Sequence, residues 1–85
     1  MRTSEVNVMS LAEAVKIRIL ELMEKKKFSQ YDFYTKGGIA KSTASQVING
    51  TRERVALKTI YEMISSMGVS LKEFFDAPIF DDVSD

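Results

Sequence analysis

The stretch "KGGIAKSTASQVING", residues 36–50, predicts two helices joined by a tight glycine turn. Gly37-Gly38 ends the first helix, because glycine readily adopts the left-handed backbone that helix ends need. The second helix is predicted from Lys41 to Asn49, with one apolar and one polar side. The polar side consists of Lys41, Ser42, Ser45 and Gln46. A polar side of this kind is free to bind something outside the domain.

Local signals place three further helices around this stretch. Ser-x-x-Glu or Ser-x-x-Asp capping boxes begin at Ser10, Ser29 and Ser70. They predict a helix to about Lys26, the short helix before Gly37, and a last helix that Pro78 closes. Apolar spacing predicts another helix over residues 57–67, with Gly68 as its left-handed stop. We therefore expect an all-α fold: a compact five-helix domain without strands.

The composition restricts the class of protein. Its 85 residues suffice for one domain, and no apolar run is long enough to span a bilayer. Cys and His are both absent, which removes disulfides, thiolate metal sites and the usual proton shuttle. Three aspartates near the C-terminus fit a solvated tail better than a metal site. We expect a soluble, cytoplasmic domain without metal, cofactor or catalytic residues.

The charges are segregated although the formal net charge is zero. Residues 25–58 hold eight of the twelve Lys and Arg residues but two of the twelve Asp and Glu residues. Residues 59–85 hold six acids and one lysine. This pattern divides the chain into an N-terminal arm (1–9), a basic-centred domain (10–76) and a loose acidic tail (77–85).

Two short helices, a glycine turn and a polar outer face form a helix-turn-helix. Residues 10–76 resemble the phage-repressor type, the lambda repressor, Cro and XRE-like family. Three segments carry the resemblance: "FSQYDF", "GGIAKSTASQVING" and "LKTIYEMISSMGVSLKEFF". The family binds double-stranded DNA as a dimer, with its third helix in the major groove. The resemblance therefore implies a lambda-repressor-like fold and sequence-specific DNA binding.

The resemblance also assigns roles to residues. The expected base contacts are Lys41, Ser42 and Gln46, with Ser45 beside them. The expected phosphate contacts are Ser29, Gln30, Asn49, Thr51, Arg52, Arg54 and Lys58. The side-chain chemistry agrees, because Gln pairs with adenine, Lys with guanine, and cations with the DNA backbone. Backbone N–H groups at the start of the second helix could also reach a phosphate.

Some positions depart from the family pattern. Ala40 and Ala56 stand where Ser or Thr caps are common, so two helices are expected to begin without a side-chain cap. Tyr34 is large where the family has a small residue, whereas Gly37 and Ala44 are small where it has larger ones. We expect Tyr34 to fill the space that the two small residues leave.

The C-terminal aromatic residues suggest how a dimer would form. The chain is too short to bury all of them within one subunit. The expected dimer interface consists of Leu71, Phe74, Phe75, Ile79 and Phe80. Ile17 and Leu20 form a second apolar patch, or a dock for the tail.

The most consistent function is a transcriptional regulator, a repressor that occupies a near-palindromic operator as a dimer. A second interpretation is an antitoxin-like module whose hydrophobic, acidic C-terminus neutralises a basic toxin or other protein partner, with DNA binding secondary. An enzyme is disfavoured, because neither a nucleophile with a base nor a phosphate-binding loop is present. RNA binding lacks an aromatic platform.

Overall fold

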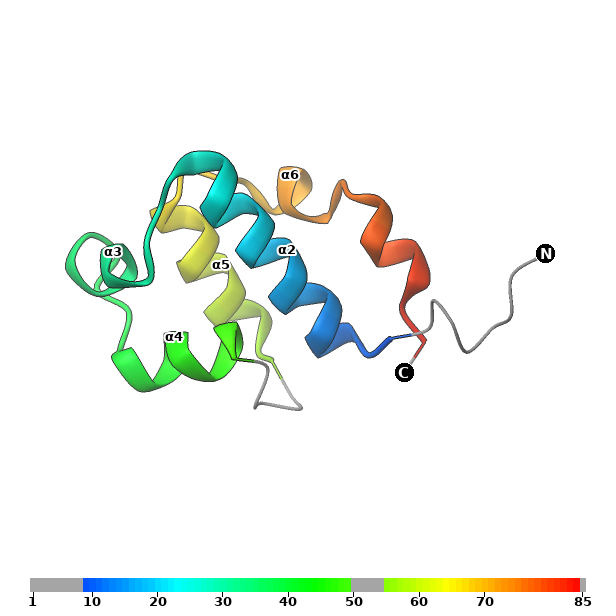
Figure 1. The fold of residues 1–85 in the computed structure, drawn as a ribbon, viewed down its shortest axis with the longest axis horizontal. Coiled ribbons are helices and arrows are strands. Elements are labelled where there is room, and N and C mark those ends of the chain that lie inside the picture. The colour runs from blue at the N-terminus through cyan, green and yellow to red at the C-terminus, as the bar shows by residue number, and fades with distance from the viewer. Residues whose placement is uncertain (1–8, 50–54, 85) are drawn as a thin grey trace.

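The computed structural model describes residues 9–49 and 55–84. The described chain is helical, which confirms the predicted all-α class (Figure 1). The helices are α2 (Leu11–Lys26), α3 (Gln30–Thr35), α4 (Lys41–Ile48), α5 (Leu57–Ser66) and α6 (Leu71–Phe75), followed by a 3-10 helix, η1 (Pro78–Asp82). No helix among these residues is long and apolar enough to cross a membrane.

Serine side chains start three of the helices as predicted. The hydroxyl oxygens of Ser10, Ser29 and Ser70 each accept a hydrogen bond from the backbone N–H three residues later, at 3.1 Å. Only the box at Ser29 is complete, since its own N–H donates to Oδ2 of Asp32 at 2.8 Å. The starts of α4 and α5, at Ala40 and Ala56, have no side-chain cap, as expected.

The helix ends agree with the sequence only in part. Gly38 and Gly68 have φ angles of 66° and 76°, in the left-handed region that favours glycine. Lys27 unexpectedly adopts the same region at the end of α2, with φ 54°. Asn49, the C-cap of α4, keeps a right-handed backbone with a φ of −87°.

One hydrophobic core joins all five α-helices. Its fully buried large side chains come from α2, α3, α5 and α6: Ile19, Leu22, Phe33, Met63, Ile64 and Phe74. Helix α4 adds Ala44, Val47 and Ile48 to the same cluster. Because α2 and α3 both pack against α4, the orientation of α4 is determined by the core rather than by its own short length.

The C-terminal segment is docked, so the prediction of a loose tail was wrong. Helix η1 packs against α2, and the ring of Phe80 lies 5.5 Å from that of Phe74 and 5.0 Å from that of Phe75. Met9 and Val83 form an isolated parallel β-bridge, in which Met9 N–H donates to the carbonyl of Asp82 at 3.1 Å. Burial of aromatic surface explains the docking. The helix η1 of the predicted tail is therefore packed against α2 rather than solvated.

Arg18 connects α2 to the end of α6. Its Nε donates to the carbonyl of Phe74 and its Nη2 to that of Glu73, each at 2.8 Å, while Nη1 pairs with Glu21. A cation at a helix C-terminus also interacts favourably with the helix dipole. Arg18 thereby fixes the point from which the docked segment continues.

Candidate nucleic-acid interface

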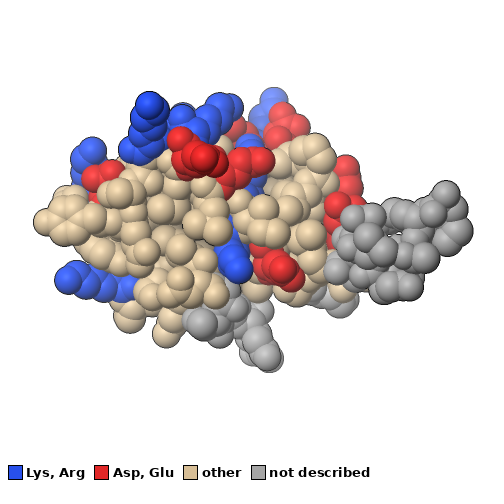
Figure 2. All heavy atoms as spheres, in the orientation of Figure 1, with Lys and Arg blue, Asp and Glu red and all other residues tan. Residues whose placement is uncertain are grey.

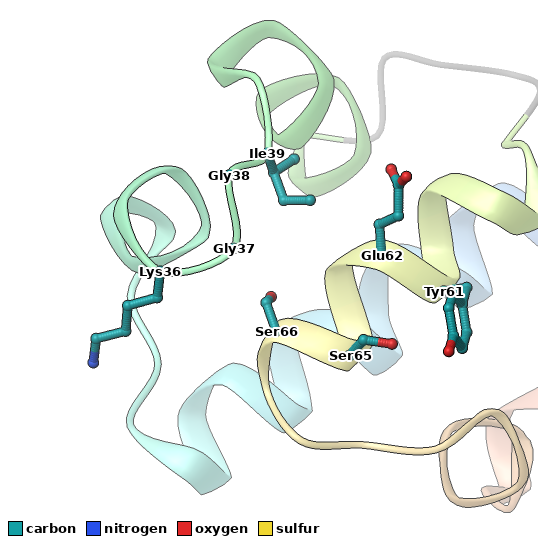
Figure 3. Close-up of a pocket in the computed structure, with 8 residues that line it drawn as sticks. All are labelled: Lys36, Gly37, Gly38, Ile39, Tyr61, Glu62, Ser65 and Ser66. Carbon is teal, nitrogen blue, oxygen red and sulfur yellow. The ribbon is translucent and has the colours of Figure 1, made fainter.

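A close contact between the glycine turn and α5 sets the position of α4. A Cβ atom at Gly37 would lie 2.7 Å from Cβ of Ser66 and 3.0 Å from the carbonyl oxygen of Phe33. In Figure 3 the Ser66 side chain points toward this turn. After the turn, Ile39 is buried and its N–H donates to the Phe33 carbonyl at 2.9 Å. The turn is thus packed against α5 at a distance that only glycine allows.

The contact with Ser66 gives a different reason for Gly37 from the one that the sequence suggested. Tyr34 was expected to fill the space left by Gly37, but α5 occupies that space through Ser66. The Tyr34 ring is half-buried, packs against the edge of the core, and extends toward α4. The proposed exchange of volume between Tyr34 and Gly37 is therefore wrong.

The outer side of α4 is polar, as predicted. Lys41, Ser42 and Gln46 are exposed, opposite the buried Ala44, Val47 and Ile48. Ser45 is half-buried, and its Oγ accepts a hydrogen bond from Nδ2 of Asn49 at 2.9 Å. Among the four predicted base contacts, Ser45 is therefore the least accessible.

The predicted phosphate contacts differ in their surroundings. The hydroxyl and N–H of Ser29 are both used in the capping box with Asp32, whose carboxylate would also repel a phosphate. The side-chain amide of Gln30 donates to the hydroxyl of Tyr34 at 2.7 Å. Asn49 and Lys58 are exposed. The predictions for Thr51, Arg52 and Arg54 lie outside the described residues.

A contact between Tyr34 and Lys41 was not predicted from the sequence. The Lys41 ammonium lies 5.8 Å from the centre of the Tyr34 ring, within the range of a cation–π interaction. Tyr34 belongs to α3 and Lys41 to α4, so the contact depends on the angle at the turn. The four-residue spacing of Gln30 and Tyr34 places them on one face of a helix, which indicates their own hydrogen bond but not the contact with Lys41.

Charge on the described surface is uneven. Figure 2 shows Lys and Arg gathered over the end of the molecule that holds α3 and the end of α2, while most of the visible acidic residues lie over the middle and toward η1. Near the start of α3, the backbone N–H of Ser29 lowers the pKa of Asp32 and opposes the weaker effect of desolvation. Lys36 also pairs with Asp32, at 3.7 Å. The negative charge of Asp32 is therefore partly balanced by the positive charge of Lys36.

An open cavity of about 410 Å³ lies beside the contact between the turn and α5 (Figure 3). Its lining residues are Lys36, Gly37, Gly38, Ile39, Tyr61, Glu62, Ser65 and Ser66. Residues 9–49 and 55–84 contain no group of three or more acidic, His or Cys side chains that could hold a metal ion.

The predicted dimer interface needs one correction. Phe74 is completely buried within the monomer, so it has no surface to offer a second subunit. Leu71, Ile79 and Phe80 are half-buried, and Phe75 is 41% exposed. The sequence reasoning missed a larger apolar pair on α5, where Leu57 is 60% and Tyr61 is 52% exposed.

The comparisons with known proteins agree with this geometry. A family model described as helix-turn-helix matches residues 19–74, about two thirds of the chain. The match includes α3, the turn and α4, and ends within α6. No curated protein and no solved structure was found to match.

Proposed function

Because the chain belongs to the XRE-type helix-turn-helix family and is thus a DNA-binding transcriptional regulator, we propose that it is a repressor. It acts in the cytoplasm as a dimer on a near-palindromic operator and blocks transcription by occupying that operator. The half-sites lie about one helical turn of DNA apart. Regulators of this family are generally not enzymes, and DNA binding alone accounts for the polar side of α4.

The observation that carries this proposal is the N-terminal end of α4. Lys41 occupies the first position of the helix, where the helix dipole disfavours a cation, and Ala40 provides no cap for the free N–H groups. A cation at the first position and a missing cap are both unfavourable for an isolated helix. Both are favourable when a DNA chain supplies negative charge and hydrogen-bond acceptors at this end.

The exposed side chains fit specific roles on DNA. Lys41 donates to O6 and N7 of a guanine, and the Gln46 amide pairs with N6 and N7 of an adenine. Each good contact of this kind discriminates against a wrong base by about 1–3 kcal/mol. Ser42 is short enough to let α4 approach the groove. Lys58, at the start of α5, contacts phosphate and adds to the salt dependence of binding.

Selection of bound sites from a random duplex library tests the proposal. We expect the wild-type protein to select a palindromic motif. Lys41→Ala and Gln46→Ala should each relax the preference at particular base positions. Lys72→Ala is the matched control, because Lys72 is an exposed lysine on α6, and it should leave the motif unchanged. Weak, salt-sensitive binding without a motif would contradict the repressor proposal and favour a protein-interaction role.

Dimer formation requires an apolar surface, and two surfaces compete. The C-terminal surface predicted from the sequence is reduced to Phe75 and its half-buried neighbours, whereas Leu57 and Tyr61 lie one turn apart on α5. Sedimentation equilibrium of Phe75→Glu and Tyr61→Glu separates them. We expect a dimer in the wild type, and a monomer in whichever variant carries its charge into the interface. A wild-type protein that stays monomeric even on operator DNA would refute the dimer.

A further inference from the structure

Tyr34 connects the start of α3 to the start of α4. One turn before it, the Gln30 amide donates to the Tyr34 hydroxyl at 2.7 Å. The ring of Tyr31 packs edge-on against the Tyr34 ring, with a centroid distance of 6.3 Å and an angle of 81°. On the side of α4, the Lys41 ammonium lies 5.8 Å from the Tyr34 ring centre. The tyrosine ring is therefore held by α3 and is in contact with a side chain of the helix that binds DNA.

The contact matters because, within residues 9–49 and 55–84, no carboxylate forms an ion pair with Lys41. A lysine side chain has four rotatable bonds and loses considerable conformational entropy when it is fixed in a complex. The electron-rich face of an aromatic ring attracts the ammonium and narrows the range of rotamers before DNA arrives.

We propose that Tyr34 is a positioning residue for Lys41, whose ring orients the ammonium toward the major groove and sharpens the base preference of this lysine. The inference rests on the proposed function, since it assumes that Lys41 contacts a base. Gln30 has an indirect part, because its bond to the hydroxyl fixes the ring. Gln30 thus has a role within the protein in addition to any phosphate contact.

Packing alone would not explain the arrangement. The ring is half-buried and contributes to the edge of the core, which an aliphatic residue of similar size could also do. An aliphatic side chain has no electron-rich face, however, and cannot hold the Lys41 ammonium. The two roles therefore separate when the ring is exchanged for an aliphatic group.

The first experiment uses the wild-type protein without DNA. A ring close to the Lys41 ammonium shifts the NMR signals of the terminal CH₂ group of this lysine upfield. We expect this shift for Lys41 and no comparable shift for Lys72, which is exposed on α6 and has no cation–π contact with any aromatic ring that the structure describes. An unshifted Lys41 signal would overturn the proposal, whatever the protein does on DNA. This measurement does not depend on whether any variant folds.

The second experiment repeats the site selection with Tyr34→Leu and with the matched control Tyr34→Phe. Tyr34→Phe keeps the aromatic face but loses the hydrogen bond from Gln30, so it should keep most of the base preference that Lys41→Ala removes. Tyr34→Leu should weaken the preference at that one position by about two- to fivefold, the size expected of one exposed cation–π contact. The Gln46 position should not change in either variant.

The outcomes distinguish the two proposals. If the wild type selects no motif, the proposed function fails, whereas the NMR shift can still be present. If the wild type selects a motif but Tyr34→Leu weakens every position equally or none, positioning by Tyr34 is refuted and the repressor proposal stands. In the Lys41→Ala background, Tyr34→Leu should have no further effect at the Lys41 position, because the two residues act through one contact.

Discussion

Replacing Gly37 by alanine tests how closely the helix-turn-helix packs against α5. The new methyl carbon would lie 2.7 Å from Cβ of Ser66, whereas nonbonded carbons normally stay about 3.5–4.0 Å apart. A side-chain rotation cannot relieve the overlap, because both atoms are attached directly to the backbone. The Phe33 carbonyl oxygen, at 3.0 Å, adds a second close contact. The turn must therefore move away from α5, and overpacking of this kind costs about 1–3 kcal/mol.

A loss of this size is large for this domain. A chain of 85 residues has a total stability of about 4–13 kcal/mol, from 0.05–0.15 kcal/mol per residue. Urea denaturation followed by circular dichroism measures the loss. Since α4 follows the turn directly, operator affinity measured on the remaining folded protein should also fall. Both effects come from the same displacement of the turn.

Two further variants identify the cause. Gly38→Ala places a methyl group in open space but at a φ of 66°, so it should cost only the left-handed strain of about 1–2 kcal/mol. Ser66→Gly removes the Cβ atom that Gly37→Ala would contact. The double variant should therefore be less destabilised than the sum of the two single changes. Strict additivity, or a loss below about 0.5 kcal/mol for Gly37→Ala, would refute the reasoning.

Three other changes have expected outcomes in the same denaturation assay. Lys27→Gly should stabilise the protein by about 0.5–1 kcal/mol, because it relieves the left-handed strain at the end of α2, whereas Lys27→Val should destabilise it. Arg18→Met should cost about 1.5–3 kcal/mol, because two carbonyls at the end of α6 lose a charged donor; an unchanged midpoint would contradict this. The folded-state pKa of Asp32 is lowered, so its ionised carboxylate stabilises the folded protein. This stabilisation is present above the unfolded pKa of about 3.9 and is lost as the pH falls through the folded value. Asp32→Asn should therefore flatten the pH dependence of stability in that acidic range, and an unaltered slope would exclude the capping box as its cause.

Helix positions were predictable from the sequence because their signals are local. Serine caps and apolar spacing act within one or two turns, so the starts of α2, α3 and α6 follow from Ser10, Ser29 and Ser70. The left-handed Lys27 was not predictable in this way. Propensity favours glycine there, and the carbonyls of Met23 and Glu24 accept hydrogen bonds from the Lys27 N–H regardless of its side chain.

The docked C-terminal segment was missed for a different reason. Its bridge joins Met9 to Val83, and its aromatic contacts join residues of different elements. Such pairings depend on the packed core and have no local pattern. The acidic composition indicated a solvated tail. Phe80 packs against the core, however, and the burial of its ring stabilises the docked segment more than the acidic residues favour solvent.

The polar side of α4 was predictable, whereas its internal contacts were not. Helical periodicity alone exposes Lys41, Ser42 and Gln46. The contact between Lys41 and Tyr34 requires the angle between two helices, which the tight approach of Gly37 to α5 determines. A sequence can thus identify which side chains face outward without showing which of them are held in place.

The two α-helices that begin without a side-chain cap start where DNA is expected to bind. Helices α2, α3 and α6 each begin with a serine cap, while α4 and α5 begin at Ala40 and Ala56 without one. The proposed DNA contacts Lys41 and Lys58 stand in the first turns of these two uncapped helices, where a cation is unfavourable. Sequences tend to break local rules at functional sites. Stability given up at the starts of α4 and α5 therefore fits a surface whose missing partner is a polyanion.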